Sequence, residues 1–142
     1  MNYDESRFSR LTKITSDNAE KLGLAWSYGL NSRRGVEATP LVVDGVMYMT
    51  APWSVVHALD AVTGEELWVY DPEVPKAWGK KGCCDVVNRG LALYEGKVYA
   101  GAFDGYLNAI DAKTGERVWK VNTLIDRSPT PSPERPGRSM AR

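Results

Sequence analysis

Two adjacent cysteines, Cys83 and Cys84, are the residues of this 142-residue chain whose type and spacing most suggest chemistry. If they pair, they close a small ring through their own peptide bond. Adjacent Cα atoms lie about 3.8 Å apart, less than the usual span of about 4.4–6.8 Å in disulfides. Such a ring is strained and rigid, and it closes almost no loop, so it suits a surface for a ligand better than a staple. The alternative is two unpaired buried thiols.

Two charged residues could act beside the cysteines. Arg89 carries a fixed fork of donors suited to a carboxylate, and Glu37 enters its predicted strand at nearly the place where Arg89 enters the next. The alternatives are a surface ion pair for Arg89 and a solvated strand-end carboxylate for Glu37. His57, the only histidine, precedes a turn motif on a predicted strand, so we expect it to be structural.

Composition excludes several classes of function. Lys+Arg and Asp+Glu both number 18, so the formal net charge is zero and nothing indicates a nucleic-acid partner. No apolar run approaches the roughly 20 residues of a membrane span. The N-terminus lacks a basic segment followed by an apolar one, so we expect no signal peptide in this chain.

Two units repeat at a spacing of 51 residues. The pattern A-x-D-A-x-T-G-E-x-x-W occurs at 58–68 and again at 109–119. Its aspartate can hydrogen-bond the turn backbone, and its glycine supplies a positive φ. Four short strands with a recurrent tryptophan every 40–50 residues are typical of a β-propeller blade. The predicted strands are 40–43, 46–50, 55–60 and 66–70, then 89–93, 97–101, 106–111 and 117–121.

Other segments surround these units. Leu22–Tyr28 is predicted as a strand with alternate residues on one face, and Ser16–Glu20 as a capped helical turn or a plain loop. The insert 71–88 joins the two blades on a face of the disc, near the central channel where propellers bind ligands. We therefore expect Glu37, the cysteines and Arg89 around one side of a common axis. The domain prediction is an all-β partial propeller over 1–127, with repeat units at 38–70 and 89–121.

The repeated motif resembles the tryptophan-docking motif of the pyrroloquinoline quinone (PQQ)-dependent alcohol dehydrogenases. R-G-V-E-A-T-P at 34–40 and G-C-C-D-V-V-N-R-G at 82–90 resemble two cofactor segments of the same methanol and ethanol dehydrogenase family. The resemblance covers about residues 3–127 and implies about two and a half blades of an eight-bladed propeller. It also implies a periplasmic enzyme that oxidises small alcohols to aldehydes and passes electrons to a cytochrome c or a haem domain.

The resemblance assigns cofactor roles to four residues. Cys83 and Cys84 match a vicinal disulfide that lies against one face of the quinone, Arg89 matches an arginine that pairs with cofactor oxygens, and Glu37 a glutamate at the cofactor's edge. The family also needs Ca²⁺ or a lanthanide, an aspartate base and a stacking tryptophan, all from later blades. We therefore expect no catalytic or metal-ligating residue here, and a chain that is inactive and at best marginally folded alone. The competing hypothesis is a non-catalytic scaffold that assembles with partner blades.

The tail at 128–142 changes in composition to proline and arginine, which predicts disorder. The family continues at this point with a segment similar to Tyr-Thr-Ile-Thr-Gly-Ala-Pro. One permitted choice of codons for Pro129–Pro136 encodes this segment when it is read in another frame. The sequence therefore predicts a frame slip from about Pro129; the alternative is a natural proline-rich terminus.

Overall fold

The structure, a computed structural model, describes residues 11–82 and 84–124. The predicted tail at 128–142 and its proposed frame slip lie outside these residues, as does Cys83. Within the described ranges, no helix has the length and hydropathy needed to cross a membrane.

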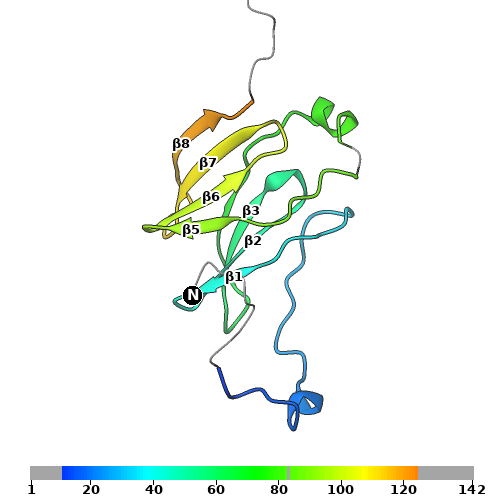
Figure 1. Cartoon of the computed structure of the whole chain (residues 1–142), viewed down its shortest axis with the longest axis vertical. Helices are drawn as coiled ribbons and strands as arrows, with labels where there is room; N and C mark the ends of the chain where they lie inside the picture. Colours follow the sequence, from blue (N-terminus) through cyan, green and yellow to red (C-terminus); the bar gives the residue numbers. More distant parts are fainter. Residues whose placement is uncertain (1–10, 83, 125–142) are drawn as a thin grey trace, which may run out of the picture.

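Two four-stranded antiparallel sheets form the body of the molecule (Figure 1). In both, each strand pairs with its neighbour in sequence, as expected of a blade. The fourth strand of each sheet carries the motif tryptophan. This confirms the predicted all-β, four-stranded repeat. The strands of the first sheet are β1 (Leu41–Val43), β2 (Val46–Thr50), β3 (Val56–Asp60) and β4 (Glu66–Tyr70); those of the second are β5 (Ala92–Tyr94), β6 (Lys97–Gly101), β7 (Tyr106–Asp111) and β8 (Arg117–Asn122).

The predicted strand at 89–93 was placed too early, because β5 begins at Ala92. Two local bonds hold the preceding residues out of the sheet. The Gly90 amide donates to the Asn88 side chain at 3.0 Å, and the Arg89 carbonyl accepts from the Thr39 amide at 3.2 Å. Gly90 has φ of +145°, which L side chains rarely adopt.

The turns follow the repeat. Asp44 and Gly45 both have positive φ, as do Glu95 and Gly96, which is the geometry of the tight hairpin turn that Asp-Gly favours. In the motif turn, the Asp60 carboxylate accepts from the Val62 and Thr63 amides at 2.8 Å. Asp111 accepts the same two bonds in the second unit, at 2.9 Å. These backbone bonds lower the pKa of both carboxyl groups.

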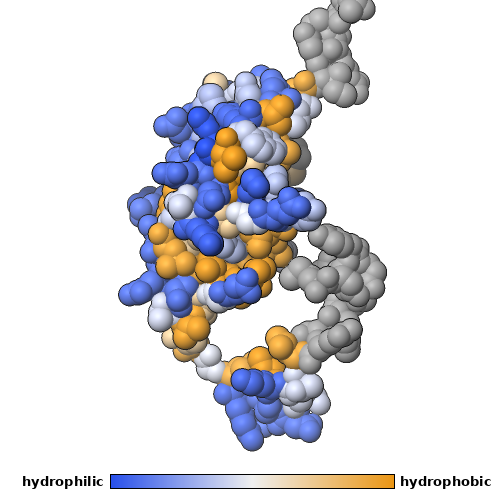
Figure 2. Space-filling model, turned by 90° about the vertical axis from the view of Figure 1, so that its left-hand side faces the viewer, coloured by the Kyte–Doolittle hydropathy of each residue, from blue (hydrophilic) through white to orange (hydrophobic). Residues whose placement is uncertain are grey.

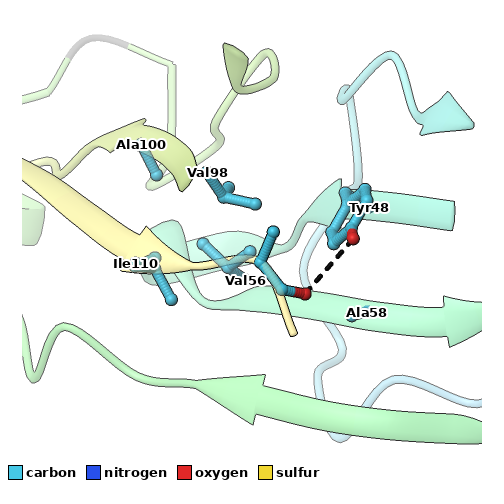
Figure 3. Packing of buried hydrophobic residues seen from close by; sticks show 7 residues of the cluster. Tyr48, Val56, Ala58, Val98, Ala100 and Ile110 are labelled. Atoms are coloured by element: carbon cyan, nitrogen blue, oxygen red, sulfur yellow. Dashed lines mark hydrogen bonds between the residues drawn. The ribbon is translucent and has the colours of Figure 1, made fainter. Parts of the chain in front are cut away.

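The main core lies between the two sheets (Figure 3). Val56 and Ala58 of β3 and Val98 and Ile110 of the second sheet are completely buried. Tyr48 of β2 reaches the turn after β7, where its hydroxyl donates to the Ala112 carbonyl at 3.2 Å. Face-to-face burial of alternate strand residues is what stabilises one blade against the next.

Trp68 docks on the turn of the second blade. Its indole N–H donates to the Ala112 carbonyl at 3.1 Å, and its ring covers Gly115, where an added Cβ would lie 2.7 Å from Trp68 Cδ2. Trp26 repeats this geometry on the first blade. Its indole N–H donates to the Ala61 carbonyl at 3.3 Å. Its ring covers Gly64, where an added Cβ would lie 2.6 Å from Trp26 Cδ2.

The predicted strand Leu22–Tyr28 is wrong in this structure, because the segment has no strand assignment. Its side chains dock on the first blade, yet no strand among the described residues pairs with its backbone. Before it, a 3-10 turn at Ala19–Lys21 (η1) stands apart from the sheets (Figure 1). The helical turn was expected, but Asn18 precedes it and no side chain caps it.

Apolar side chains reach the surface of both sheets among polar ones (Figure 2). Trp119 is 39% exposed, and among the described residues its indole N–H has no acceptor. The second blade therefore ends on an undocked tryptophan, as one unit of a longer stack would. The large exposed apolar residues of the strands are Val42, Leu67, Val69, Tyr94, Val118, Trp119 and Val121.

Candidate functional site

Glu37 and Arg89 lie together although 52 positions separate them in the sequence. Each lies on the connection that leads into the first strand of its blade. Arg89 Nη2 is 3.4 Å from Glu37 Oε2, and the Thr39 amide donates to the Arg89 carbonyl. The expectation that the repeat brings these charges to one side of the molecule is confirmed for this pair.

Both side chains of the pair remain open to solvent. Arg89 is 79% exposed and Glu37 48%. The alternative of a surface ion pair thus describes part of what Arg89 does, with Glu37 as the partner. An exposed ion pair contributes only about 0–1 kcal/mol, and a guanidinium has five N–H donors, so Arg89 keeps donors for a ligand.

The cysteine segment (Gly82–Arg89) ends at Arg89 of this pair. Its described residues pack on the second blade. The Asn88 side chain donates from Nδ2 to the Gly101 carbonyl at 2.8 Å. Phe103 covers Gly82, where an added Cβ would lie 2.3 Å from the ring, so a larger residue would require the Phe103 ring to move. Cys84 follows with an exposed side chain. Cys84 and Asp85 are thus exposed, while Gly82 and Asn88 on either side of them are fixed to the second blade.

Two residues that the sequence did not single out, Arg34 and Trp53, hold the same segment from the first blade. The Arg34 guanidinium forms an ion pair with the Asp85 carboxylate, next to Cys84. The Trp53 amide donates to the Val86 carbonyl at 2.9 Å. Arg34 lies in the R-G-V-E-A-T-P segment, which offered a signal. Trp53 gave none, because the equivalent position of the second unit, 51 residues on, is Asp104.

His57 packs under the docked N-terminal segment. The residue is 9% exposed, and its Nδ1 lies 3.4 Å from the Tyr28 hydroxyl, which donates to Glu66. Burial lowers the pKa of His57, and burial and the Glu66 carboxylate raise the pKa of Tyr28 to about 12. Asn108 makes the matching contact in the second blade, with the Tyr70 hydroxyl at 3.0 Å. These contacts support the structural role predicted for His57.

A pocket of about 630 Å³ opens beside this contact. Its lining includes Tyr28, Arg34, Trp53, Glu66 and Lys76, but neither Glu37 nor Arg89. It is therefore separate from the charged pair, while Arg34 both lines the pocket and forms an ion pair with Asp85. In residues 11–82 and 84–124, no three His, Cys, Asp or Glu side chains form a group that could hold a metal ion.

The chain matches the profile of the family "PQQ: Glucose/ethanol/alcohol dehydrogenase, beta-propeller domain" over residues 1–132. It is 68% identical over 126 residues to the 1-butanol dehydrogenase (cytochrome c) of Thauera butanivorans. The aligned region covers 87% of this chain and 18% of that protein. It is 61% identical over 124 residues to the quinohemoprotein alcohol dehydrogenase of Comamonas testosteroni, with the same two shares.

Solved structures give the same relationship. The Comamonas testosteroni crystal structure superposes with a TM-score of 0.82 over 86% of this chain and 18% of that one. A europium-containing methanol dehydrogenase, 39% identical, gives 0.77 over 83% of this chain and 21% of that one. BamB from Moraxella catarrhalis, 22% identical, gives 0.53 and shares the fold alone. The chain thus spans about a fifth of the proteins that it resembles in sequence.

Proposed function

This chain belongs to the PQQ glucose/ethanol/alcohol dehydrogenase β-propeller family, and from that premise we propose that it supplies one wall of a PQQ site in an alcohol-oxidising enzyme. Glu37, Cys83, Cys84 and Arg89 are the residues that we assign to this wall. The observation that carries the proposal is the convergence of Glu37 and Arg89, from adjacent blades, beside the cysteine segment. A scaffold that only holds blades together gives no reason for this convergence.

The donor set fits the cofactor. PQQ is flat and carries carboxylates and quinone oxygens, which suit the exposed guanidinium fork of Arg89. Glu37 offers an acceptor at the edge of the same site. A disulfide between Cys83 and Cys84 would give a rigid surface against which a planar ring can lie. When bound, the quinone supplies the two-electron oxidising power, while these residues bind it and orient it.

The remaining parts of the site must come from other blades. We propose that Ca²⁺ or a lanthanide, the aspartate base and the second stacking ring are contributed by residues outside this chain. The same holds for the route of electrons to a cytochrome c or haem domain and for the periplasmic location. The substrate class is a small primary alcohol, which is supported by the butanol, alcohol and methanol dehydrogenases among its relatives.

A chimaera tests the proposal in a complete propeller. The matched residues of this chain replace the corresponding segment of the Comamonas testosteroni enzyme, to which they are 61% identical. We expect the chimaera to retain PQQ and to reduce its haem when an alcohol is added. Arg89→Gln and Glu37→Gln should each weaken PQQ binding about 10- to 100-fold, because each removes a charged partner of the ligand.

Matched controls use exposed residues of the same types. Arg117→Gln on β8 and Glu20→Gln in η1 should leave PQQ affinity unchanged. Equal losses in the control and site variants would contradict the assignment. The chain alone should not retain PQQ with Ca²⁺ after desalting. Stoichiometric retention would show that the site is more complete than we propose.

The cysteine pairing has its own test. We expect Cys83 and Cys84 to form a disulfide in protein from an oxidising compartment, which intact mass with and without reductant detects. Two freely alkylated thiols in such protein would disprove the pairing. Protein from the bacterial cytosol is not a fair sample, because that compartment keeps thiols reduced.

A further inference from the structure

We propose that Arg34 and Trp53 are positioning residues, which fix the cysteine segment (Gly82–Arg89) from the first blade and thereby orient the face that it presents. The inference deepens the proposed function, on which its relevance to PQQ rests. The contacts themselves belong to this chain and can be measured without the cofactor.

The first contact is the ion pair between Arg34 and Asp85. It joins equivalent positions of the two repeat units, 51 residues apart, so it ties the connection before one blade to the connection before the next. Asp85 follows Cys84 directly and has φ of +69°, a left-handed conformation that a non-glycine residue keeps only when its surroundings hold it there. Arg34 is the charged partner that the structure provides for this residue.

The second contact comes from Trp53. This residue also has positive φ, at +64°, and its amide donates to the carbonyl of Val86, one position after Asp85. Val86 is 1% exposed, so its carbonyl needs a partner within the protein. The Trp53 ring lies over Gly79, where an added Cβ would be 2.9 Å from Cη2. Glycine at this position lets the indole lie close to the backbone of the insert.

The two contacts form one unit, because Arg34 also stacks on Trp53. The Arg34 Cζ atom lies 5.5 Å from the ring centroid, and Lys76 Nζ lies 4.1 Å from it. A cation held over an indole gains from the ring quadrupole. Three separate connections, before β1, between β2 and β3, and after β4, thus meet at one ring. Together with Phe103 and the Gly101 carbonyl on the second blade, which contact Gly82 and Asn88, they hold the cysteine segment from both sides.

The contacts among Arg34, Trp53 and Asp85 do not follow the repeat. The residues that dock blade on blade recur at the 51-residue spacing, whereas Trp53 is replaced by Asp104 in the second unit. The equivalents Arg34 and Asp85 differ in charge and pair with each other. These residues are therefore not among the docking contacts that recur from blade to blade, and their shared target is the segment that carries Cys83, Cys84 and Arg89.

Hydrogen exchange in the chimaera tests the proposal through amides 82–90. We expect Arg34→Met and Trp53→Leu to raise exchange in this segment about three- to tenfold while amides of β2, β3, β6 and β7 keep their protection. The charge-swapped double variant Arg34→Asp, Asp85→Arg should recover most of the loss, while each single reversal should not. Arg33→Met, the neighbouring exposed arginine, is the matched control.

The outcomes separate this inference from the proposed function. Unchanged exchange at 82–90 would overturn it, and so would an equal rise across both blades, which indicates general destabilisation. If exchange rises locally, the reduction rate of a Cys83–Cys84 disulfide should rise with it, and PQQ affinity should fall less than in Arg89→Gln. A chimaera that never binds PQQ would reject the proposed function, while the exchange data would still decide the positioning role.

Discussion

Three tryptophans at matching positions meet three different surroundings in this chain. Trp68 belongs to a sheet strand and docks on the next blade, whereas Trp26 docks in the same way from a segment without strand partners. Trp119 belongs to a sheet strand but has no docking turn in the described residues. Docking and strand pairing are therefore separable. The docking depends on an indole, a carbonyl and a glycine, and it does not require that the sheet behind the indole be complete.

The largest expected effect is at Trp68. In the isolated chain, which we expect to be marginally folded, Trp68→Ala should lower the free energy of unfolding by about 2–4 kcal/mol and leave the chain largely unfolded, because it opens the interface between the blades. Trp119→Ala should cost less than about 1 kcal/mol, because the described part of the chain has no turn on which it docks. Urea unfolding followed by circular dichroism measures both. In the chimaera, where the next blade is present, the two costs should become similar; a persistent difference there would show that the two docking sites are not equivalent.

A smaller effect separates backbone strain from collision at the docking glycines. Gly115→Ala places a methyl group 2.7 Å from the Trp68 ring at φ of +75°, so we expect a loss of about 2–3 kcal/mol in the free energy of unfolding. Gly96→Ala, with φ of +70° and no atom within 4 Å of its added Cβ, should cost only about 1 kcal/mol. Equal costs for the two variants would mean that Trp68 moves aside without penalty.

Trp26 should show docking without a sheet. Trp26→Ala should lower the free energy of unfolding by less than about 1 kcal/mol, because no strand pairing is lost with it. It should nevertheless accelerate proteolysis between residues 22 and 35 by about fivefold or more, since the segment is released from the blade. Trp26→Phe keeps a ring but loses the bond to the Ala61 carbonyl, so its cleavage rate should lie between those of the unsubstituted chain and Trp26→Ala. Identical cleavage of all three proteins would contradict the docking.

The smallest effect is a pH dependence at the first blade alone. Because burial lowers the folded-state pKa of His57 below its ordinary 6.5, the unfolded chain binds more protons in that range. Stability should be complete above pH 6.5 and fall as the pH drops from there through the lowered pKa. His57→Asn, which copies Asn108 of the second blade, should remove this part of the pH profile. A profile unchanged by the substitution would assign the dependence to other groups.

The sequence predicted the fold well because the repeat carries it. The turn aspartates, the glycines of positive φ and the spacing of the tryptophans placed seven of eight strands nearly as the structure has them. Leu22–Tyr28 was predicted as a strand from its alternation, but pairing depends on a neighbour that periodicity cannot supply. The convergence of Glu37 and Arg89 followed from their equivalent places in the two units. Arg34, Asp85 and Trp53 were missed because their contacts cross between connections and depart from the repeat.

The Ala112 carbonyl, which receives both the Tyr48 hydroxyl and the Trp68 indole, has a consequence for how such chains change over time. A main-chain acceptor is present whatever side chain the gene encodes there. The docking contact between blades therefore requires only that the receiving turn keep its shape and its glycine. Units that keep this turn and a matching tryptophan can be duplicated, exchanged between genes or lost in whole blades with their joints intact. Loops such as the one carrying the cysteines remain free to acquire chemistry of their own.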